Sequence, residues 1–508
     1  MGDEAAGAIR FGSTAGRWIV AVSVLGSGIA FLEATVVNVA LPEIGRDLEA
    51  DTGALQWTLN GYLVTLSALI LLGGSLGDRV GRRRVFNIGV VWFTVASVVC
   101  AFAPSVELLV AARVLQGVGG ALLTPGSLAI IEATFRPEDR ARAIGAWSGL
   151  GGVGAAIGPL LGGYLVDAVS WRAIFLINVP FGIFVVVMAN RHIPETRDPT
   201  AVGRLDYPGA VLAVVGLASA TYALIGASEG AGTTTILVSG AAGVVGLGGF
   251  IVTERRSANP MMPLSIFASR QFAAANLVTF TVYAALGGVF FLLVAFLQIS
   301  LGYSAIAAGA ASLPVTALML LLSPRAGALA QRIGPRLPLT LGPLLIAAGM
   351  LLMTQIDRGD SYITSVFPAV FVYGLGLALV VAPVTATVLA AADERHSGVA
   401  SGVNNAVARV AGLIAVAALP LVAGLSGPDF FDPIAMAEGF GIAMVATAAL
   451  AASGALLAWF TIDAQVLETA PLTPDESRVR ARSDRHCAVA GTPLGSRHPS
   501  PEVHQSQG

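Results

Sequence analysis

The sequence predicts an all-helical membrane protein with fourteen membrane-spanning helices. Hydrophobic residues make up 55% of the 508-residue chain and charged residues only 12%, about half of the roughly 25% that is typical of a soluble domain. The mean hydropathy is +0.78. Apolar runs close to the roughly 20 residues that a spanning helix needs recur along the chain. The net charge of −2 argues against nucleic acid as a partner.

The apolar runs define the expected spans in order. They centre near residues 29, 66, 94, 119, 154, 181, 217, 244, 285, 313, 347, 376, 410 and 448. The first run, residues 18–41, is too long for the apolar part of a cleavable signal, and acidic residues follow it. We therefore expect it to remain as a span. An even number of spans places both termini on the same side of the membrane.

The arginines predict which side that is, because basic residues between short spans stay in the cytoplasm. One set of loops carries Arg10, Arg17, Arg79, Arg82, Arg83, Arg84, Arg136, Arg140, Arg142, Arg191, Arg197, Arg204, Arg255, Arg256, Arg325, Arg332, Arg336 and Arg395. The opposite set carries only Arg46, Arg172 and Arg358, and it is acidic. We expect a protein of the cytoplasmic membrane with both termini in the cytoplasm.

The chain also repeats itself. The string GGSLGDRVGRRR at residues 73–84 is echoed by SPRAGALAQRIGPR at residues 323–336. Similar halves offset by roughly 250 residues are typical of transporters built from parallel repeats. We expect two six-helix halves, an inserted helix pair between them and a polar, disordered tail. Their boundaries would be 1–196, 197–262, 263–460 and 461–508.

The string at residues 73–84 predicts a tight cytoplasmic turn between two spans. Its glycines would relieve the backbone where two helices end close together, and its acid could pair with an arginine or a helix N-terminus. The expected gating residues are Gly77, Asp78, Arg79, Gly81, Arg82 and Arg83.

Glycines recur at nearly four-residue spacing in the fifth span, within GAAIGPLLGG at residues 154–163. Such spacing makes a flat face that a neighbouring helix can approach closely, and a proline bends the helix. The residues are Gly154, Gly158, Pro159, Gly162 and Gly163. Helix packing alone would also explain them.

Three charged residues lie inside expected spans, where a charge costs roughly 2.5–3.5 kcal/mol and should face protein or water. Glu33 and Arg113 lie at similar depths in the first and fourth spans, and they could pair. Desolvation favours a protonated carboxyl group, whereas an arginine neighbour favours the anion, so such a pair could load and release a proton. A structural ion pair, or snorkelling of the arginine to the interface, is the alternative. Arg409 lies near mid-membrane in the thirteenth span.

These strings together resemble the fourteen-span drug–proton antiporter branch of the major facilitator superfamily. The resemblance covers residues 15–460 and includes FLEATVVNVALP (31–42), LLVAARVLQG (108–117), WRAIFLINVP (171–180), LDYPG (205–209) and NAVARVAG (405–412). The first of these usually has Asp where this chain has Glu33. That difference weakens the inference about cargo range and cation preference.

The resemblance implies the major facilitator fold and proton-coupled efflux of amphipathic or cationic drugs or antibiotics by alternating access. Glu33 and Arg113 would couple the proton, and Arg409 would be a second charge in the cavity. Residues 154–163 would be the antiporter motif at the interface of the two halves, and residues 73–84 would latch the cytoplasmic side. An exporter of an endogenous metabolite, antibiotic or lipid is the main alternative, and a transporter-like membrane sensor is another.

The sequence predicts no enzyme, because its five histidines lie in loops or the tail and it has no lysine for a phosphate-binding loop. We expect no cofactor and no metal, with protons as the coupling ion. The expected partners are a drug-like small molecule and the lipid bilayer, and we expect the protein to be a monomer.

Overall fold

The computed structural model describes residues 9–198, 205–257, 259–392 and 397–467. Within helices, it leaves undescribed the side chains at positions 141, 148, 149, 151–156 and 397. Residues 468–508, most of the expected tail, lie outside the described part of the chain.

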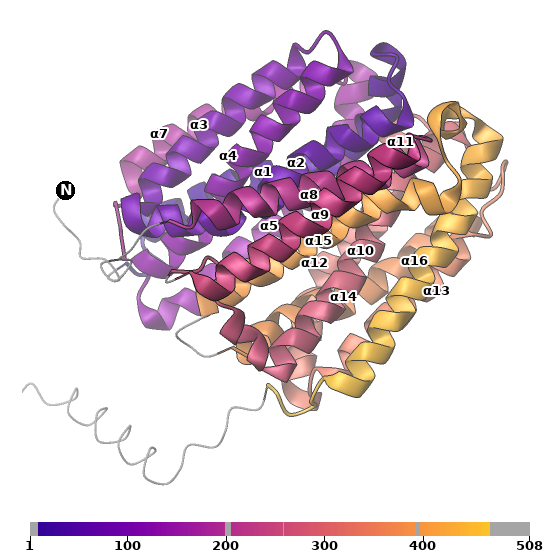
Figure 1. Cartoon of the computed structure of the whole chain (residues 1–508). Coiled ribbons are helices and arrows are strands. Elements are labelled where there is room, and N and C mark those ends of the chain that lie inside the picture. The colour runs from indigo at the N-terminus through magenta and orange to yellow at the C-terminus, as the bar shows by residue number, and fades with distance from the viewer. Residues whose placement is uncertain (1–8, 199–204, 258, 393–396, 468–508) are drawn as a thin grey trace, which may run out of the picture. The chain divides into compact units, whose positions relative to one another are not determined.

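Seven α-helices form the N-terminal half (Figure 1). They are α1 (Thr14–Asp47), α2 (Thr52–Val80), α3 (Arg82–Ala101), α4 (Val106–Thr134), α5 (Pro137–Ala168), α6 (Ala173–Leu176) and α7 (Asn178–His192). The short α6 and the longer α7 together make one span, Ala173–His192. The break between them brings Asn178 to the beginning of α7.

The hairpin that follows the first half consists of α8 (Tyr207–Ser228) and α9 (Thr233–Arg256). The C-terminal half contains η1 (Leu264–Ala268), α10 (Arg270–Ile299), α11 (Ala305–Ala311), α12 (Leu313–Ile333), α13 (Arg336–Met353), η2 (Tyr362–Val366), α14 (Phe367–Ala390), α15 (Ser397–Ala423), η4 (Gly427–Phe431) and α16 (Pro433–Thr461). Aspartates at helix starts accept backbone hydrogen bonds, as Asp51 does from Ala54 at 2.7 Å and Asp206 from Gly209 at 2.8 Å.

Thirteen helical segments among the described residues are long and apolar enough to cross a membrane. Each coincides with one of the fourteen runs expected from the sequence. The remaining run corresponds to α5, a 32-residue helix. It is not among the thirteen, and the side chains in its middle are not described. The expectation of an all-helical membrane protein is confirmed.

Both halves repeat one pattern of helix packing. In the first half, α1 packs on α5 and α7, α2 on α4, and α3 on α4 and α7. In the second half, α10 packs on α15 and α16, α12 on α14, and α13 on α14 and α16. The pairings of the two halves correspond when the spans of each half are counted in chain order, with α6 and α7 counted as one span and α11 and α12 as another. Between the halves, α5 packs on α11 and α15 packs on α2, which are also equivalent pairs.

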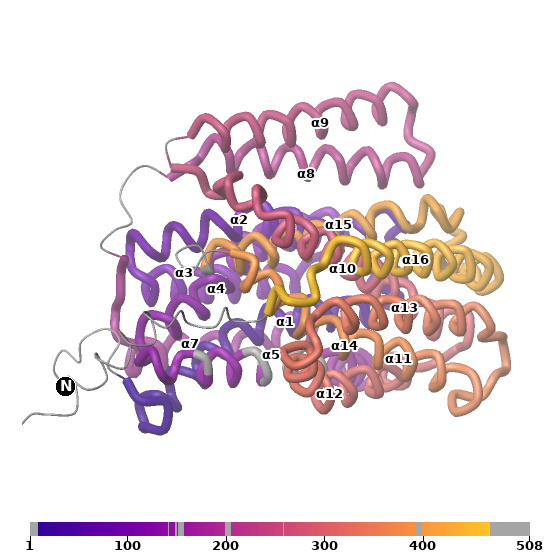
Figure 2. The backbone as a smooth tube through the Cα atoms, turned by 90° about the horizontal axis from the view of Figure 1, so that it is seen from below, coloured from indigo at the N-terminus to yellow at the C-terminus, as the bar shows by residue number. Residues whose placement is uncertain are grey.

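The inserted hairpin lies along one flank of the other helices, with α8 nearer to them than α9 (Figure 2). Its inner face packs on both halves at once, because α8 contacts α2 and α15. Ala213 and Leu217 of α8 are buried against Val64 and Ala68 of α2 and Leu413 of α15. The exact limits of the halves and of the hairpin segment stay predictions.

The expected turn at residues 73–84 is mostly helical, and this prediction was wrong. Helix α2 continues to Val80 and α3 begins at Arg82, so Gly81 alone joins them. Its φ of 131° is a backbone conformation that only glycine adopts readily. Gly334, at φ 82°, and Pro335 separate α12 from α13. The sequence echo therefore corresponds to two short joints, each with one glycine at positive φ.

Hydrogen bonds between the halves gather at the end of the bundle opposite the arginine-rich loops. Thr52 donates to the carbonyl of Gly427 at 2.8 Å, and Gln298 donates to the carbonyl of Val39 at 3.0 Å. The carboxylate of Asp167 accepts the backbone amides of Ala305 and Ile306 at 3.2 and 2.8 Å. The two halves are thus clasped together at their arginine-poor end.

Candidate functional site

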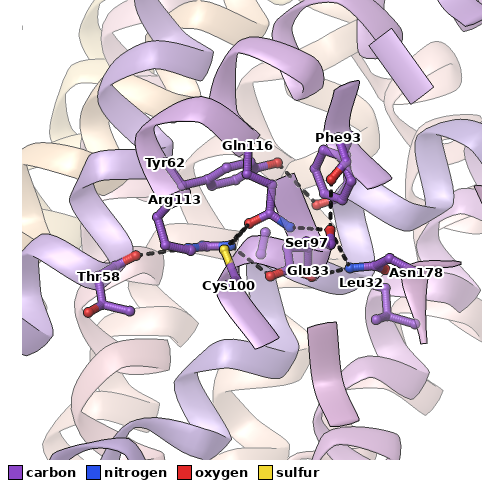
Figure 3. A network of polar contacts seen from close by, with 12 residues as sticks. Leu32, Glu33, Thr58, Tyr62, Phe93, Ser97, Cys100, Arg113, Gln116 and Asn178 are labelled. Atoms are coloured by element: carbon purple, nitrogen blue, oxygen red, sulfur yellow. Dashed lines mark hydrogen bonds and ion pairs between the residues drawn. The ribbon is translucent and has the colours of Figure 1, made fainter. Parts of the chain in front are cut away.

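The centre of the candidate site is a buried ion pair between Glu33 of α1 and Arg113 of α4 (Figure 3). The arginine Nη1 lies 2.7 Å from the carboxylate Oε1 of Glu33, and the side chains are 1% and 0% exposed. The pairing expected from their similar depths is therefore present. Burial this complete means that neither charge is compensated by water.

Other hydrogen bonds hold the guanidinium of Arg113 independently of Glu33. Its Nε donates to the carbonyl of Thr58 at 2.9 Å, and its Nη1 also donates to Oε1 of Gln116 at 2.6 Å. The ring of Tyr62 lies under the guanidinium, 4.6 Å from ring centre to Cζ, a cation–π contact. Arg113 would thus keep polar and aromatic neighbours if Glu33 became neutral.

The second oxygen of Glu33 is held from the other side of the site. Asn178 donates from Nδ2 to Oε2 at 2.8 Å, and the same nitrogen lies 3.2 Å from the hydroxyl of Ser97. Gln116 closes the ring by donating from Nε2 to that hydroxyl at 2.8 Å. Five side chains from four spans therefore form one connected polar network, as Figure 3 shows.

The local fold explains why these groups meet. Gln116 lies three residues after Arg113, so both side chains project from the same face of α4. The break before α7 places Asn178 at a helix start, opposite Glu33. A buried charge pair contributes little net stability over an apolar core, but removing one partner costs about 3–5 kcal/mol. The network is therefore sensitive to any change in the charge of one member.

Arg409 of α15 does not belong to this network. Its guanidinium carbon lies 5.7 Å from the ring centre of Phe31 on α1, across the junction between the halves. The side chain is only partly buried. Among the described residues it forms no ion pair within 4.0 Å.

The glycine face of α5 is used for close approach, as expected. A side chain at Gly158 or Gly162 would collide with Thr35 or Val36 of α1. A Cβ at Gly163 would lie 2.5 Å from the carbonyl oxygen of Ala305 on α11. The helix therefore packs tightly on its own half and on the other half. The carbonyl of Pro159 approaches α11 as well, and the surroundings of Gly154 lie outside the described residues.

The expected gating residues gather around the joint between α2 and α3. Asp78 accepts a hydrogen bond from Nε of Arg82 at 2.8 Å, so its arginine partner lies one turn away in sequence. Gly77 lies inside α2, and Arg79 has partners of its own. Arg83 donates from Nη1 to the carbonyl of Ile193 at 3.0 Å.

A carboxylate that sequence reasoning missed completes this joint. Glu195 accepts the backbone amides of Arg83 and Arg84 at 3.1 and 3.2 Å, and so caps the N-terminus of α3. A Cβ at Gly81 would lie 2.6 Å from Oε1 of Glu195. Glycine is thus required here both by its backbone angle and by its neighbour.

The model of the family described as "Major Facilitator Superfamily" matches residues 23–416. The chain belongs to the major facilitator superfamily.

Several relatives within the superfamily are resistance proteins. The chain is 35% identical over 397 residues to the multidrug resistance protein Stp of Mycobacterium tuberculosis, covering 78% of this chain and 73% of Stp. It is 36% identical over 423 residues to the tetracenomycin C resistance and export protein of Streptomyces glaucescens, covering 82% and 78%. The expected resemblance to drug-exporting members is confirmed.

A solved structure shares the fold. It is a bacterial homologue of the human lysosomal transporter Spinster in an inward-facing and unoccupied conformation, with a TM-score of 0.63 and 17% sequence identity. The match covers 91% of this chain and all of that one. The superfamily match and the curated relatives identify the protein as a multi-span membrane transporter and not an enzyme.

Asn178, Ser97, Thr58 and Tyr62 are site residues of this transporter that sequence reasoning did not single out. Asn178 lies within the string at residues 171–180, which resembled the family, but nothing in that string shows that it faces Glu33. No group of three or more His, Cys, Asp or Glu side chains in the described chain could hold a metal ion.

A second carboxylate joins the hairpin to both halves at the arginine-poor end. Glu229, which follows α8, accepts the backbone amide of Gly427 at 3.5 Å and also that of Gly53. Burial raises the pKa of Glu229 above its usual value and the charge of Asp51 raises it further, whereas the two amides lower it.

Proposed function

We propose that this transporter exports amphipathic drugs or antibiotics across the cytoplasmic membrane in exchange for protons. The observation that carries the proposal is the buried pair of Glu33 and Arg113, with no other carboxylate near it among the described contacts. Because the carboxylate of Glu33 is completely buried, it cannot form an ion pair between surface loops. It suits a site that binds a proton when the pathway opens to one side.

The network supports a proton cycle without loss of order. When Glu33 is ionised, it accepts hydrogen bonds from Arg113 and Asn178. When Glu33 gains a proton, the ion pair is lost, but Gln116 and the carbonyl of Thr58 still hold the guanidinium. Proton binding therefore changes the charge of the site while leaving Arg113 in place.

Alternating access would connect that charge change to substrate movement. In this proposal the clasp at the arginine-poor end opens for outward release. The glycine face of α5 packs on α1 and α11, and we expect the opening to occur there. Because α1 also carries Glu33, a shift of α1 against α5 and α11 would disturb both the interface and the ion pair. The joint at Gly81 would contribute the latch at the opposite side.

The proposal also includes the orientation of the protein in the membrane and its oligomeric state. The arginine-rich loops and both termini would lie in the cytoplasm, and the protein would act as a monomer without a cofactor. A dedicated exporter of an endogenous antibiotic, metabolite or lipid is the second candidate, and the relationship to a tetracenomycin C export protein favours it over a membrane sensor.

The test is transport in proteoliposomes with an imposed pH gradient, with a collapsed gradient as the control. The wild-type protein should move an amphipathic dye only while the gradient lasts. Glu33→Gln should bind the dye but lose the dependence on the gradient. Glu43→Gln is the matched control, because Glu43 lies on the same helix in an exposed pair with Arg46. Gradient-driven transport that persists unchanged in Glu33→Gln would assign the pair a structural role only.

A further inference from the structure

A group of one cation and two aromatic rings spans the junction between the halves. Arg409 lies near the middle of α15, and its guanidinium faces the ring of Phe31 on α1. The ring of Trp147 on α5 lies 6.4 Å from that of Phe31, centre to centre. All three side chains are only partly buried. A molecule that entered between the halves would meet them.

The register of α2 against α15 adds a polar group at nearly the same level. The amide of Gln56 donates to the carbonyls of Val416 and Ala417, and a side chain at Gly402 would contact Leu71. The two helices are therefore antiparallel, and Asn60 lies about one helical turn from the level of Arg409. Asn60 is fully buried, and neither its oxygen nor its nitrogen has a hydrogen-bond partner.

The charge at this junction is positive. The carboxylate of Glu33 is already occupied by Arg113 and Asn178, at 2.7 and 2.8 Å. Arg409 has no carboxylate partner among the described residues. A cation in a protein interior within the membrane is costly unless another group compensates it. A substrate with a negative charge would supply that compensation, whereas a cationic substrate would add to the repulsion.

We propose that Arg409 binds the acidic group of the substrate, that Phe31 and Trp147 bind its aromatic body, and that the transporter therefore handles aromatic organic anions in preference to cations. This inference rests on the proposed export function and narrows it. The planar guanidinium of arginine suits a carboxylate, which it can bind through two parallel hydrogen bonds. Among the described residues, no ion pair or hydrogen bond places an unpaired carboxylate beside Arg409 for the cationic cargo expected from the sequence.

Two xanthene dyes of similar size and opposite charge provide the test. Binding of fluorescein, an anion, and rhodamine 123, a cation, is measured by fluorescence polarisation on the full-length protein in nanodiscs without a pH gradient. The wild-type protein should bind fluorescein more tightly. Arg409→Gln should weaken fluorescein binding about tenfold, the loss of one charge-assisted contact. Arg409→Lys should keep most of it, and Arg409→Glu should reverse the preference.

Arg336→Gln is the matched control, because Arg336 also lies over an aromatic ring, 4.5 Å from Trp459, but outside the junction. It should bind both dyes as the wild type does. Size-exclusion profiles check that every variant is folded. Equal binding of the two dyes, or fluorescein binding that is unaffected by Arg409→Gln in a folded variant, would overturn the inference. Fluorescein that binds through Arg409 but is not moved by a pH gradient would instead contradict the proposed export function.

Discussion

Replacing Glu33 with glutamine should destabilise the protein mainly by leaving Arg113 as an unpaired cation. The hydrogen bonds themselves can be repaired. A glutamine oxygen can face Arg113, and its amide group would then face Asn178. Because Oδ1 of Asn178 has no partner, rotation of the Asn178 amide would present an acceptor. What cannot be repaired is the buried charge, whose isolation costs about 3–5 kcal/mol.

The paired experiment isolates this charge effect. Arg113→Met should cost less, because a buried carboxyl group without an arginine neighbour binds a proton instead of remaining an anion. The double variant contains neither charge, so its loss of stability should be at least about 2 kcal/mol smaller than the sum of the two single losses. That difference is the coupling between the two side chains.

Equilibrium unfolding in mixed micelles with increasing SDS measures each free energy. The exposed pair of Glu43 and Arg46, whose oxygen and nitrogen lie 3.3 Å apart, provides the control cycle, with an expected coupling of about 1 kcal/mol or less. Losses that simply add in the Glu33–Arg113 double variant would refute the argument, because the two charges would then not depend on each other.

Three further predictions concern the ends of the bundle. Gly81→Ala should lower the free energy of unfolding by about 1–3 kcal/mol, because alanine is strained at a φ of 131°. Gly77→Ala, in the preceding helix, should lower it only slightly. Equal thermal unfolding midpoints for the two variants would contradict this prediction. Burial raises the pKa of Glu229 in the folded protein. The contribution of Glu229 to stability should therefore be fully present below about pH 4.3 and lost as pH rises through the raised pKa. Unfolding temperatures measured from pH 4 to 8 should show this pH dependence in the wild type and lack it in Glu229→Gln. In the repeat at residues 323–336, Gln331 stands at the position that corresponds to Asp78. Asp78→Asn should impair dye transport more than Gln331→Leu, since only the first position holds an acid paired with arginine. Equal losses would rule out unequal latching of the halves.

Helix positions were largely predictable because membrane burial imposes a strong local pattern. A span must be apolar over roughly 20 residues, whatever it packs against. The joint at residues 73–84 shows where local reasoning failed. Its glycines and charges are typical of a turn, but a helix tolerates them at its polar end, and one residue with positive φ is enough to reverse the chain.

The candidate site was predictable only in part. The depths of Glu33 and Arg113 could be estimated from their positions in two spans, so their pairing was a reasonable expectation. Asn178 lies 145 residues from Glu33 along the chain, and Glu195 lies 112 residues from Arg83. Which polar residue turns toward a given charge depends on helix rotation and on the break between α6 and α7.

The sequence alone determined the helical membrane class, the order of the spans, the repeat and the identity of the charges inside the membrane. These follow from composition and spacing, because lipid excludes polar residues from long stretches of chain. Only the tertiary structure decided which charges are neutralised. It joined Glu33 to Arg113 within one half and left Arg409 facing the ring of Phe31 in the other half, because helix packing brings together residues that no local pattern relates.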